Sequence, residues 1–294
     1  MTYILKNKNL EIHIDAPLEN YNFSRFDWTG KIVKVKCHDI DFASSEILDG
    51  KEAHKFGRGF YNEFGIDTPI GFDETPIGGW FHKIGVGLLQ KEENNYDFLK
   101  AYKIKPALFK VKSDSKNYLV TCKSPVNKGY SYILKKEIKL LNNGFVINYN
   151  LKNTGDKKII TTEYVHNFMA VKKDFIGPNY LLKFPFKIKT HPLSEAVNPQ
   201  QKVNLKQNQI DFNGIPKSPF FFSFLTGGKM VDASWELINF KNKIGISETG
   251  DFKTNKINLW GSKHVISPEL FFNINLNANE TIKWSRTYTI FNLD

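Results

Sequence analysis

The chain has 294 residues, of which 41% are apolar and 24% are charged, as in an ordinary folded globular protein. Its formal net charge is +11, and the positive charge is almost all lysine spread along the chain, because arginine occurs only at positions 25, 58 and 286. Proteins that read nucleic acids usually cluster arginine, so this pattern argues against a nucleic-acid partner.

The sequence also argues against membrane insertion and secretion. It contains no run of about eighteen apolar residues, and its first residues lack the apolar region of a signal peptide. Cys37 and Cys122 are too few for a disulfide framework or a metal site. We therefore expect a cytoplasmic protein without membrane contact and without a metal or other cofactor.

Short strands dominate the predicted elements. Residues 31–37 alternate apolar and lysine side chains, and Asn142-Asn143-Gly144 is a hairpin signal. Many short strands separated by turns predict an all-β protein, a large antiparallel β-sandwich that forms a single domain over residues 1–294. The other strand candidates are 2–14, 108–113, 117–124, 130–140, 144–152, 180–190, 220–226, 230–240, 243–248, 257–260, 263–266, 270–276 and 281–291.

Residues 50–90 are rich in glycine, and we interpret them as a long irregular loop. Loops of this length inside a compact domain are usually functional. We expect the loop to fold over one end of a ligand cleft and to bring Glu63, His82 or Lys83 toward the ligand. The alternative is a surface loop whose glycines are only structural.

The stretch 159–171 is mostly β-branched, aromatic or apolar, which predicts a strand. The period of two places Tyr164, His166 and Phe168 on one face and Asn167 on the other. A second strand follows Pro268, with Glu269 and Phe271 on one face. The alternatives are a hydrogen-bonded core histidine and a glutamate that faces solvent.

These segments occur in an order that resembles the aldose 1-epimerase (galactose mutarotase-like) superfamily. The resemblance covers most of the chain and is carried by Asn153-Thr154-Gly155, Val165-His166-Asn167-Phe168, Pro268-Glu269 and the closing segment Asn277 to Tyr288. The segments Arg25 to Gly30, Glu63 to Gly65 and Phe81 to Gly87 are similar to a bacterial branch of that superfamily.

Two positions depart from the family pattern. Val165 stands where classical mutarotases carry asparagine, and Ala278-Asn279-Glu280 replaces a Pro-Gly-Glu turn. The second histidine and the substrate-binding arginine of the family have only positional candidates here, His82 and Arg58.

The resemblance implies that the chain interconverts the anomers of a sugar. One group removes the proton of the O1 hydroxyl while another protonates the ring oxygen, and the open aldehyde then rotates and closes again. Glu269 is the implied base and His166 the implied acid. We expect the two groups to stand about 5–9 Å apart, as acid and base groups that flank a sugar do, without a closed salt bridge.

The implied partner is a small-molecule sugar, an aldohexose or a derivative, bound by a monomer or homodimer. Two alternatives stay open: a hexose-6-phosphate epimerase, and a non-catalytic carbohydrate-binding protein in which Trp28, Trp80 and Trp260 stack on sugars. A polysaccharide lyase fits less well, because the chain is too short for the helical domain that often accompanies such folds. The expected substrate-binding residues are Arg25, Trp28, Glu63, His82, Lys83, Asn167 and Trp260.

Overall fold

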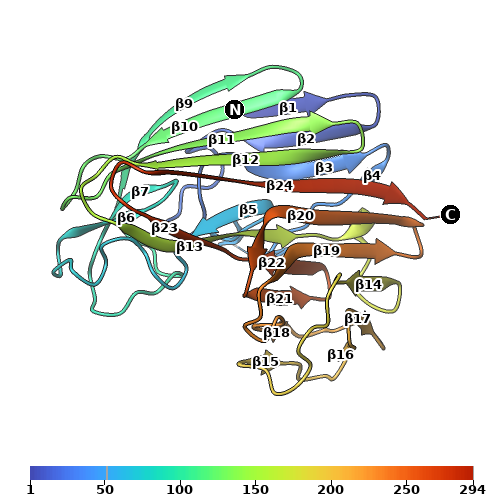
Figure 1. Ribbon diagram of the computed structural model, residues 1–294. Coiled ribbons are helices and arrows are strands. Elements are labelled where there is room, and N and C mark those ends of the chain that lie inside the picture. Colours follow the sequence, from blue (N-terminus) through green and yellow to red (C-terminus); the bar gives the residue numbers. More distant parts are fainter. Residues whose placement is uncertain (51, 294) are drawn as a thin grey trace.

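The computed structural model describes residues 1–50 and 52–293, and antiparallel strands make up most of it (Figure 1). The only helical elements among these residues are two 3-10 turns, η1 (Ala53–Lys55) and η2 (Val171–Lys173). The all-β prediction is therefore confirmed. None of the described helical segments is long and apolar enough to cross a membrane.

The larger layer is a ten-stranded sheet. The predicted turn is present, because Leu141 and Gly144 close the hairpin between its strands β11 and β12. In spatial order the sheet contains β16 (Val203–Leu205), β17 (Gln209–Phe212), β14 (Tyr180–Lys183), β19 (Val231–Asn239), β20 (Ile244–Thr254), β24 (Thr281–Asn292), β12 (Gly144–Asn153), β11 (Tyr132–Leu141), β10 (Asn117–Lys123) and β9 (Leu108–Ser113).

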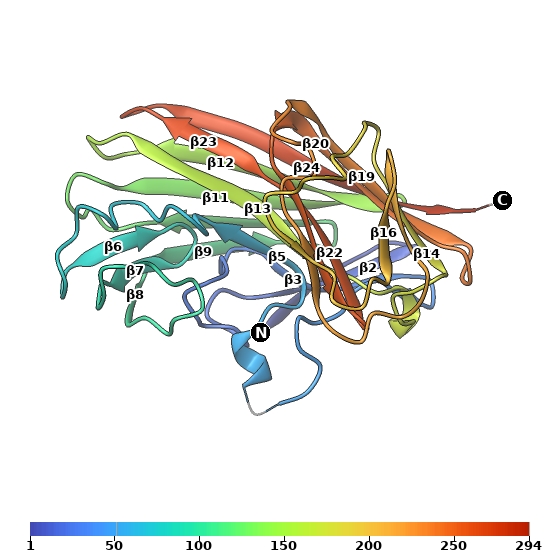
Figure 2. The same ribbon diagram turned by 90° about the horizontal axis from the view of Figure 1, so that it is seen from below.

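The second layer is a seven-stranded sheet of β1 (Thr2–Lys6), β2 (Leu10–Asp15), β3 (Lys31–Cys37), β5 (Gly59–Phe64), β13 (Ile159–Phe168) and β23 (Phe272–Leu276), with β4 (Ile40–Asp41) paired to β3. Two smaller sheets accompany the layers: a three-stranded sheet at one end, on the left of Figure 2, and a four-stranded sheet in the lower part of Figure 1. One consists of β15 (Ala196–Val197), β18 (Phe220–Phe222), β21 (Ile257–Ser262) and β22 (Val265–Leu270), and the other of β6 (Trp80–Lys83), β7 (Gly87–Gln90) and β8 (Ile104–Pro106).

The hydrophobic core lies between the two large sheets. Buried apolar side chains from Leu5 to Ile290 form one continuous cluster, which also reaches the four-stranded sheet at Phe220 and Leu259. Phe60 on β5 makes edge-to-face contacts with Phe145 on β12 and Tyr288 on β24, at centroid distances of 5.6 and 5.2 Å. Such aromatic contacts add to the apolar area that the layers bury between them.

The interpretation of 50–90 as a continuous irregular loop needs correction. Its residues Gly59–Phe64 form β5, which pairs with β13 in the middle of the seven-stranded sheet. Every residue of β5 is buried, so the strand lacks the alternation of apolar and polar residues that reveals a half-buried strand. Two further strands, β6 and β7, lie in the same stretch.

One antiparallel register aligns β13 with β23 and then with β22. Glu163 pairs with Phe272 at one end, and Met169 forms an isolated bridge with Ile266 at the other. Both pairs obey the same register, which places His166 directly opposite Glu269. The fold thus brings together two residues that lie about a hundred positions apart in the sequence.

Candidate active site

A cavity of about 630 Å³ opens beside β13 and β22. This volume is within the roughly 300–1,000 Å³ that is usual for small-molecule sites. Aromatic side chains form much of its wall, and charged groups are concentrated at a few points. The lining residues that matter for the argument are Arg25, Tyr164, His166, Lys256, Trp260 and Glu269.

His166 and Glu269 form a direct pair at the inner wall of this cavity. The imidazole Nε2 lies 3.1 Å from the Glu269 carboxyl Oε1, and both side chains are almost completely buried. The expected separation of about 5–9 Å without a closed contact is therefore wrong for this structure. That expectation placed the two groups on opposite sides of a sugar, whereas the register of the strands places them side by side.

Two neighbours hold the imidazole in place. The Ser267 hydroxyl is hydrogen-bonded to His166 Nδ1 at 2.7 Å. The Phe168 ring stacks on the imidazole with a centroid distance of 4.3 Å. Sequence reasoning did not identify Ser267, although its position two residues before Glu269 puts it on the same face of β22.

Burial suppresses the charges of the pair. Desolvation raises the pKa of Glu269 to about 8, against the opposing effect of Arg25. Desolvation, with a smaller effect from Arg25, holds the pKa of His166 well below its ordinary value of 6.5. At neutral pH Glu269 therefore carries a proton that it can donate to the neutral His166 Nε2, and His166 Nδ1–H can donate to Ser267.

Arg25 lines the cavity and is held by two carboxylates. Its Nη1 donates to Glu46 at 2.8 Å, and its Nε donates to Glu63 at 3.0 Å. Glu63 is fully buried behind Arg25, where it also accepts hydrogen bonds from Tyr164 and Lys83. Of the three residues expected from 50–90, Glu63 and Lys83 thus stand behind the cavity wall rather than in its lining.

Trp260 lies in the cavity lining, with its ring edge-on to His166 at a centroid distance of 5.9 Å. The structure does not bring three other expected side chains to this cavity. Trp28 is buried and donates to the Phe23 carbonyl, and Asn167 points into the core on the opposite face of β13. The third, His82, lies on β6 next to Lys83, also outside the lining of this cavity.

His82 is fully buried near Tyr130 and Tyr132, and neither ring nitrogen has a hydrogen-bond partner among the described residues. Desolvation lowers the pKa of His82 to about 4, so the ring is neutral. Arg58, the positional candidate for a substrate-binding arginine, instead donates to Asp15 at 2.6 Å. Neither residue lines the cavity of the His166–Glu269 pair.

Several lining residues could not have been identified from sequence patterns. Tyr164 and Phe271 stack on each other across the register at a centroid distance of 4.5 Å. Lys256 is paired with Asp67 at 3.0 Å and lies over the Phe271 ring. The only signal in the sequence was that Tyr164 and Phe271 share strand faces with His166 and Glu269.

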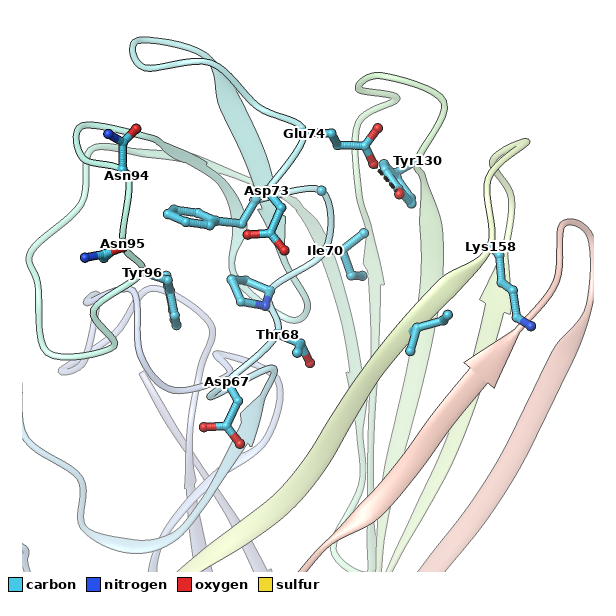
Figure 3. Close-up of a pocket in the computed structure, with 14 residues that line it drawn as sticks. Asp67, Thr68, Ile70, Asp73, Glu74, Asn94, Asn95, Tyr96, Tyr130 and Lys158 are labelled. Carbon is cyan, nitrogen blue, oxygen red and sulfur yellow. Dashed lines mark hydrogen bonds between the residues drawn. The ribbon is translucent and has the colours of Figure 1, made fainter.

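A second cavity, of about 650 Å³, lies beside the segment 67–74 (Figure 3). Asn94, Asn95 and Tyr96 stand on one side of it and Lys158 on the other (Figure 3). It shares Asp67 with the first cavity but does not include His166 or Glu269. Its lining is mostly exposed, so we assign the candidate active site to the cavity with the buried acid–base pair.

The fold is similar to solved structures over its whole length. A galactose mutarotase related enzyme from Lactobacillus acidophilus has a TM-score of 0.60 at 12% identity, covering 100% of this chain and 99% of that one. A galactose mutarotase-like protein from Clostridium acetobutylicum has a TM-score of 0.59 at 12% identity, with coverages of 99% and 95%. A candidate aldose 1-epimerase from Escherichia coli K12 has a TM-score of 0.62 at 10% identity, with coverages of 100% and 99%.

These likenesses show that the chain has the galactose mutarotase-like fold, as the sequence resemblance predicted. Neither a scan against models of protein families nor a search of curated proteins finds a match. Identities of 10–12% carry the fold alone, so the chemistry has to be argued from the site.

Proposed function

We propose that this protein is an aldose 1-epimerase-like isomerase that interconverts sugar anomers at His166 and Glu269. The observation that carries the proposal is the buried pair, with 3.1 Å between His166 Nε2 and Glu269 Oε1, at the wall of a cavity of about 630 Å³. Ring opening needs one group that accepts a proton and one that donates a proton at neighbouring oxygens. The pair supplies both.

In the proposed reaction, Glu269 accepts one proton from the sugar while His166 donates one proton to it. With Glu269 ionised and His166 protonated, Glu269 takes the proton of the O1 hydroxyl, and His166 gives its proton to the ring oxygen as the C1–O5 bond breaks. The open aldehyde rotates about C1–C2. Ring closure then runs in reverse, as Glu269 returns a proton to O1 and His166 takes one from the O5 hydroxyl.

The short separation of the pair suits this reaction. O1 and O5 are bonded to the same carbon, so the acid and the base can approach from one side of the sugar. The form with the proton on Glu269 and the form with the proton on His166 contain equal numbers of protons. The two groups therefore titrate as a coupled pair rather than independently.

The cavity wall supports a neutral sugar more than a sugar phosphate. Trp260, Phe271 and Tyr164 present aromatic surface, which suits the apolar C–H faces of a pyranose. The cations in the lining are already paired, Arg25 with Glu46 and Glu63 and Lys256 with Asp67. These carboxylates offset the positive charge that would attract a phosphate, so we propose an unphosphorylated aldohexose.

The test is anomer exchange measured by NMR on a panel of hexoses and hexose 6-phosphates. Glu269→Gln keeps the shape of the side chain but removes the ionisable group, and we expect exchange to fall by on the order of 10²–10⁴-fold. Glu236→Gln, the same change at an exposed position of β19, is the control and should leave the rate unchanged. Wild-type binding of a hexose without exchange would instead favour a non-catalytic carbohydrate-binding protein.

A further inference from the structure

The strand that carries Glu269 is held along one edge by side chains instead of by a neighbouring backbone. Among the described residues, main-chain pairing between β13 and the β22–β23 edge stops at Glu163–Phe272 and resumes only at the Met169–Ile266 bridge. The carbonyls of Pro268 and Leu270 lie in this interval, immediately before and after Glu269. Buried carbonyls need partners, so the groups that bind these two define the position of Glu269.

Asn167 binds the first carbonyl. Its Nδ2 donates to Pro268 O at 2.7 Å, and the shared register places these two residues opposite each other. Asn167 is also the neighbour of His166 on β13. A single side chain therefore joins the strand that carries the imidazole to the strand that carries the carboxyl group.

Arg286 binds the second carbonyl. Its Nη2 donates to Leu270 O at 2.9 Å and also to Glu163 at 2.6 Å. Its Nη1 donates to Glu248 at 2.6 Å. Arg286 and both glutamates are fully buried in the core and do not line the cavity of the pair.

Glu248 connects the two anchors. Its Oε2 accepts hydrogen bonds from Asn167 Nδ2 and from the Trp235 indole, each at 2.9 Å. The Tyr288 hydroxyl donates to Asn167 Oδ1 at 2.9 Å, so the asparagine amide is bound at both ends. The two side chains that donate to Pro268 O and Leu270 O are thus themselves held by further hydrogen bonds.

Stability alone does not account for this cluster. Buried ion pairs are costly to desolvate, and well-packed apolar residues of similar volume are often as stable or more stable. A buried charged network can instead be useful because it fixes the positions of the groups bound to it. We propose that Asn167 and Arg286 are positioning residues that set the distance between His166 and Glu269, an inference that rests on the proposed function.

The primary test is Asn167→Ala, assayed by anomer exchange and by NMR titration of the His166 ring. A displacement of about 1 Å at a reacting group can cost on the order of 10²-fold, so we expect kcat to fall by roughly 10–100-fold with little change in KM. The alkaline limb of the rate profile should also move, because a wider separation weakens the coupling between the two titrations. Arg286→Lys should change kcat and the profile in the same direction, since lysine cannot reach all of its partners.

Asn153→Ala is the matched control. Asn153 is also fully buried and donates to a strand carbonyl, that of Leu276 at 3.2 Å, but it lies away from the pair. We expect it to lose thermal stability while kcat and the pH profile stay as in the wild type. Asn167→Ala with the same outcome as Asn153→Ala would overturn the positioning role.

The two proposals fail in different ways. If the wild type accelerates no anomer exchange, the proposed function fails, and the His166 titration still reports on positioning. An unchanged His166 titration in Asn167→Ala would then reject the positioning role, and a shifted titration would support it.

Discussion

His166 Nε2 lies 3.1 Å from Glu269 Oε1, and the two side chains meet because their strands share one register across the site. Burial makes the neutral form of this pair the resting form. Desolvation raises the pKa of Glu269 and lowers the pKa of His166, so one proton stays on the pair through the neutral range.

Activity should therefore decrease on the alkaline side. Desolvation raises the pKa of Glu269 to about 8, and above that pH the pair loses the proton that it must donate. We expect kcat/KM to be level near neutrality and to fall by about tenfold per pH unit well above pH 8. The measurement is anomer exchange across the alkaline range, with the uncatalysed rate subtracted at each pH. An enzymatic rate that keeps rising beyond pH 9 would contradict the assignment.

The same shift makes stability depend on pH. Because burial raises the pKa of Glu269 from 4.5 to about 8, the folded state binds the extra proton in that range, and stability falls as the pH rises through it. A shift of one pKa unit corresponds to about 1.4 kcal/mol. The ionisation of Glu269 alone should therefore lower the free energy of unfolding by on the order of 3–5 kcal/mol across this range.

Glu269→Gln removes this dependence. Urea unfolding at several pH values should show that the free energy of unfolding of the variant rises relative to that of the wild type between pH 5 and pH 8.5. His166 acts in the opposite direction, because its lowered pKa makes stability fall as the pH drops below 6.5. Parallel curves for the two proteins would show that Glu269 titrates normally.

Removal of the Ser267 hydroxyl should disturb the orientation of the imidazole. Ser267 is fully buried and holds His166 Nδ1 at 2.7 Å. The loss of a hydrogen bond of about 1 kcal/mol predicts a decrease in kcat of roughly fivefold to tenfold for Ser267→Ala, with KM nearly unchanged. Ser267→Thr keeps a hydroxyl and should recover much of the rate. Equal rates for the Ala and Thr variants would argue against the hydrogen bond.

Trp260 should contribute to sugar binding rather than to proton transfer. Its ring lines the cavity and contacts His166 edge-on. Aromatic contacts of this kind contribute about 0.5–1.5 kcal/mol, so Trp260→Ala should raise KM roughly threefold to tenfold, and Trp260→Phe should raise it less. Trp80→Ala is the control, because Trp80 lies outside this cavity. A fall in kcat alone would contradict the binding role.

The local features of this protein can be predicted from the order of its residues. The apolar and β-branched runs indicate strands, and Asn142-Asn143-Gly144 indicates the hairpin between β11 and β12. The period of two also separates His166 from Asn167, since adjacent strand residues point to opposite faces. These signals are local, and the backbone geometry of a strand or a turn is enough to produce them.

The contacts between distant residues depend on long-range packing instead. The contact between His166 and Glu269 depends on the register of β13 with β22, and the partner of each strand edge is chosen by packing over the whole molecule. The same long-range pairing made β5 a central strand, took Asn167 and His82 into buried positions, and placed Ser267 beside the imidazole. No period or spacing in the chain encodes such contacts, because they join segments whose separation in the sequence is arbitrary.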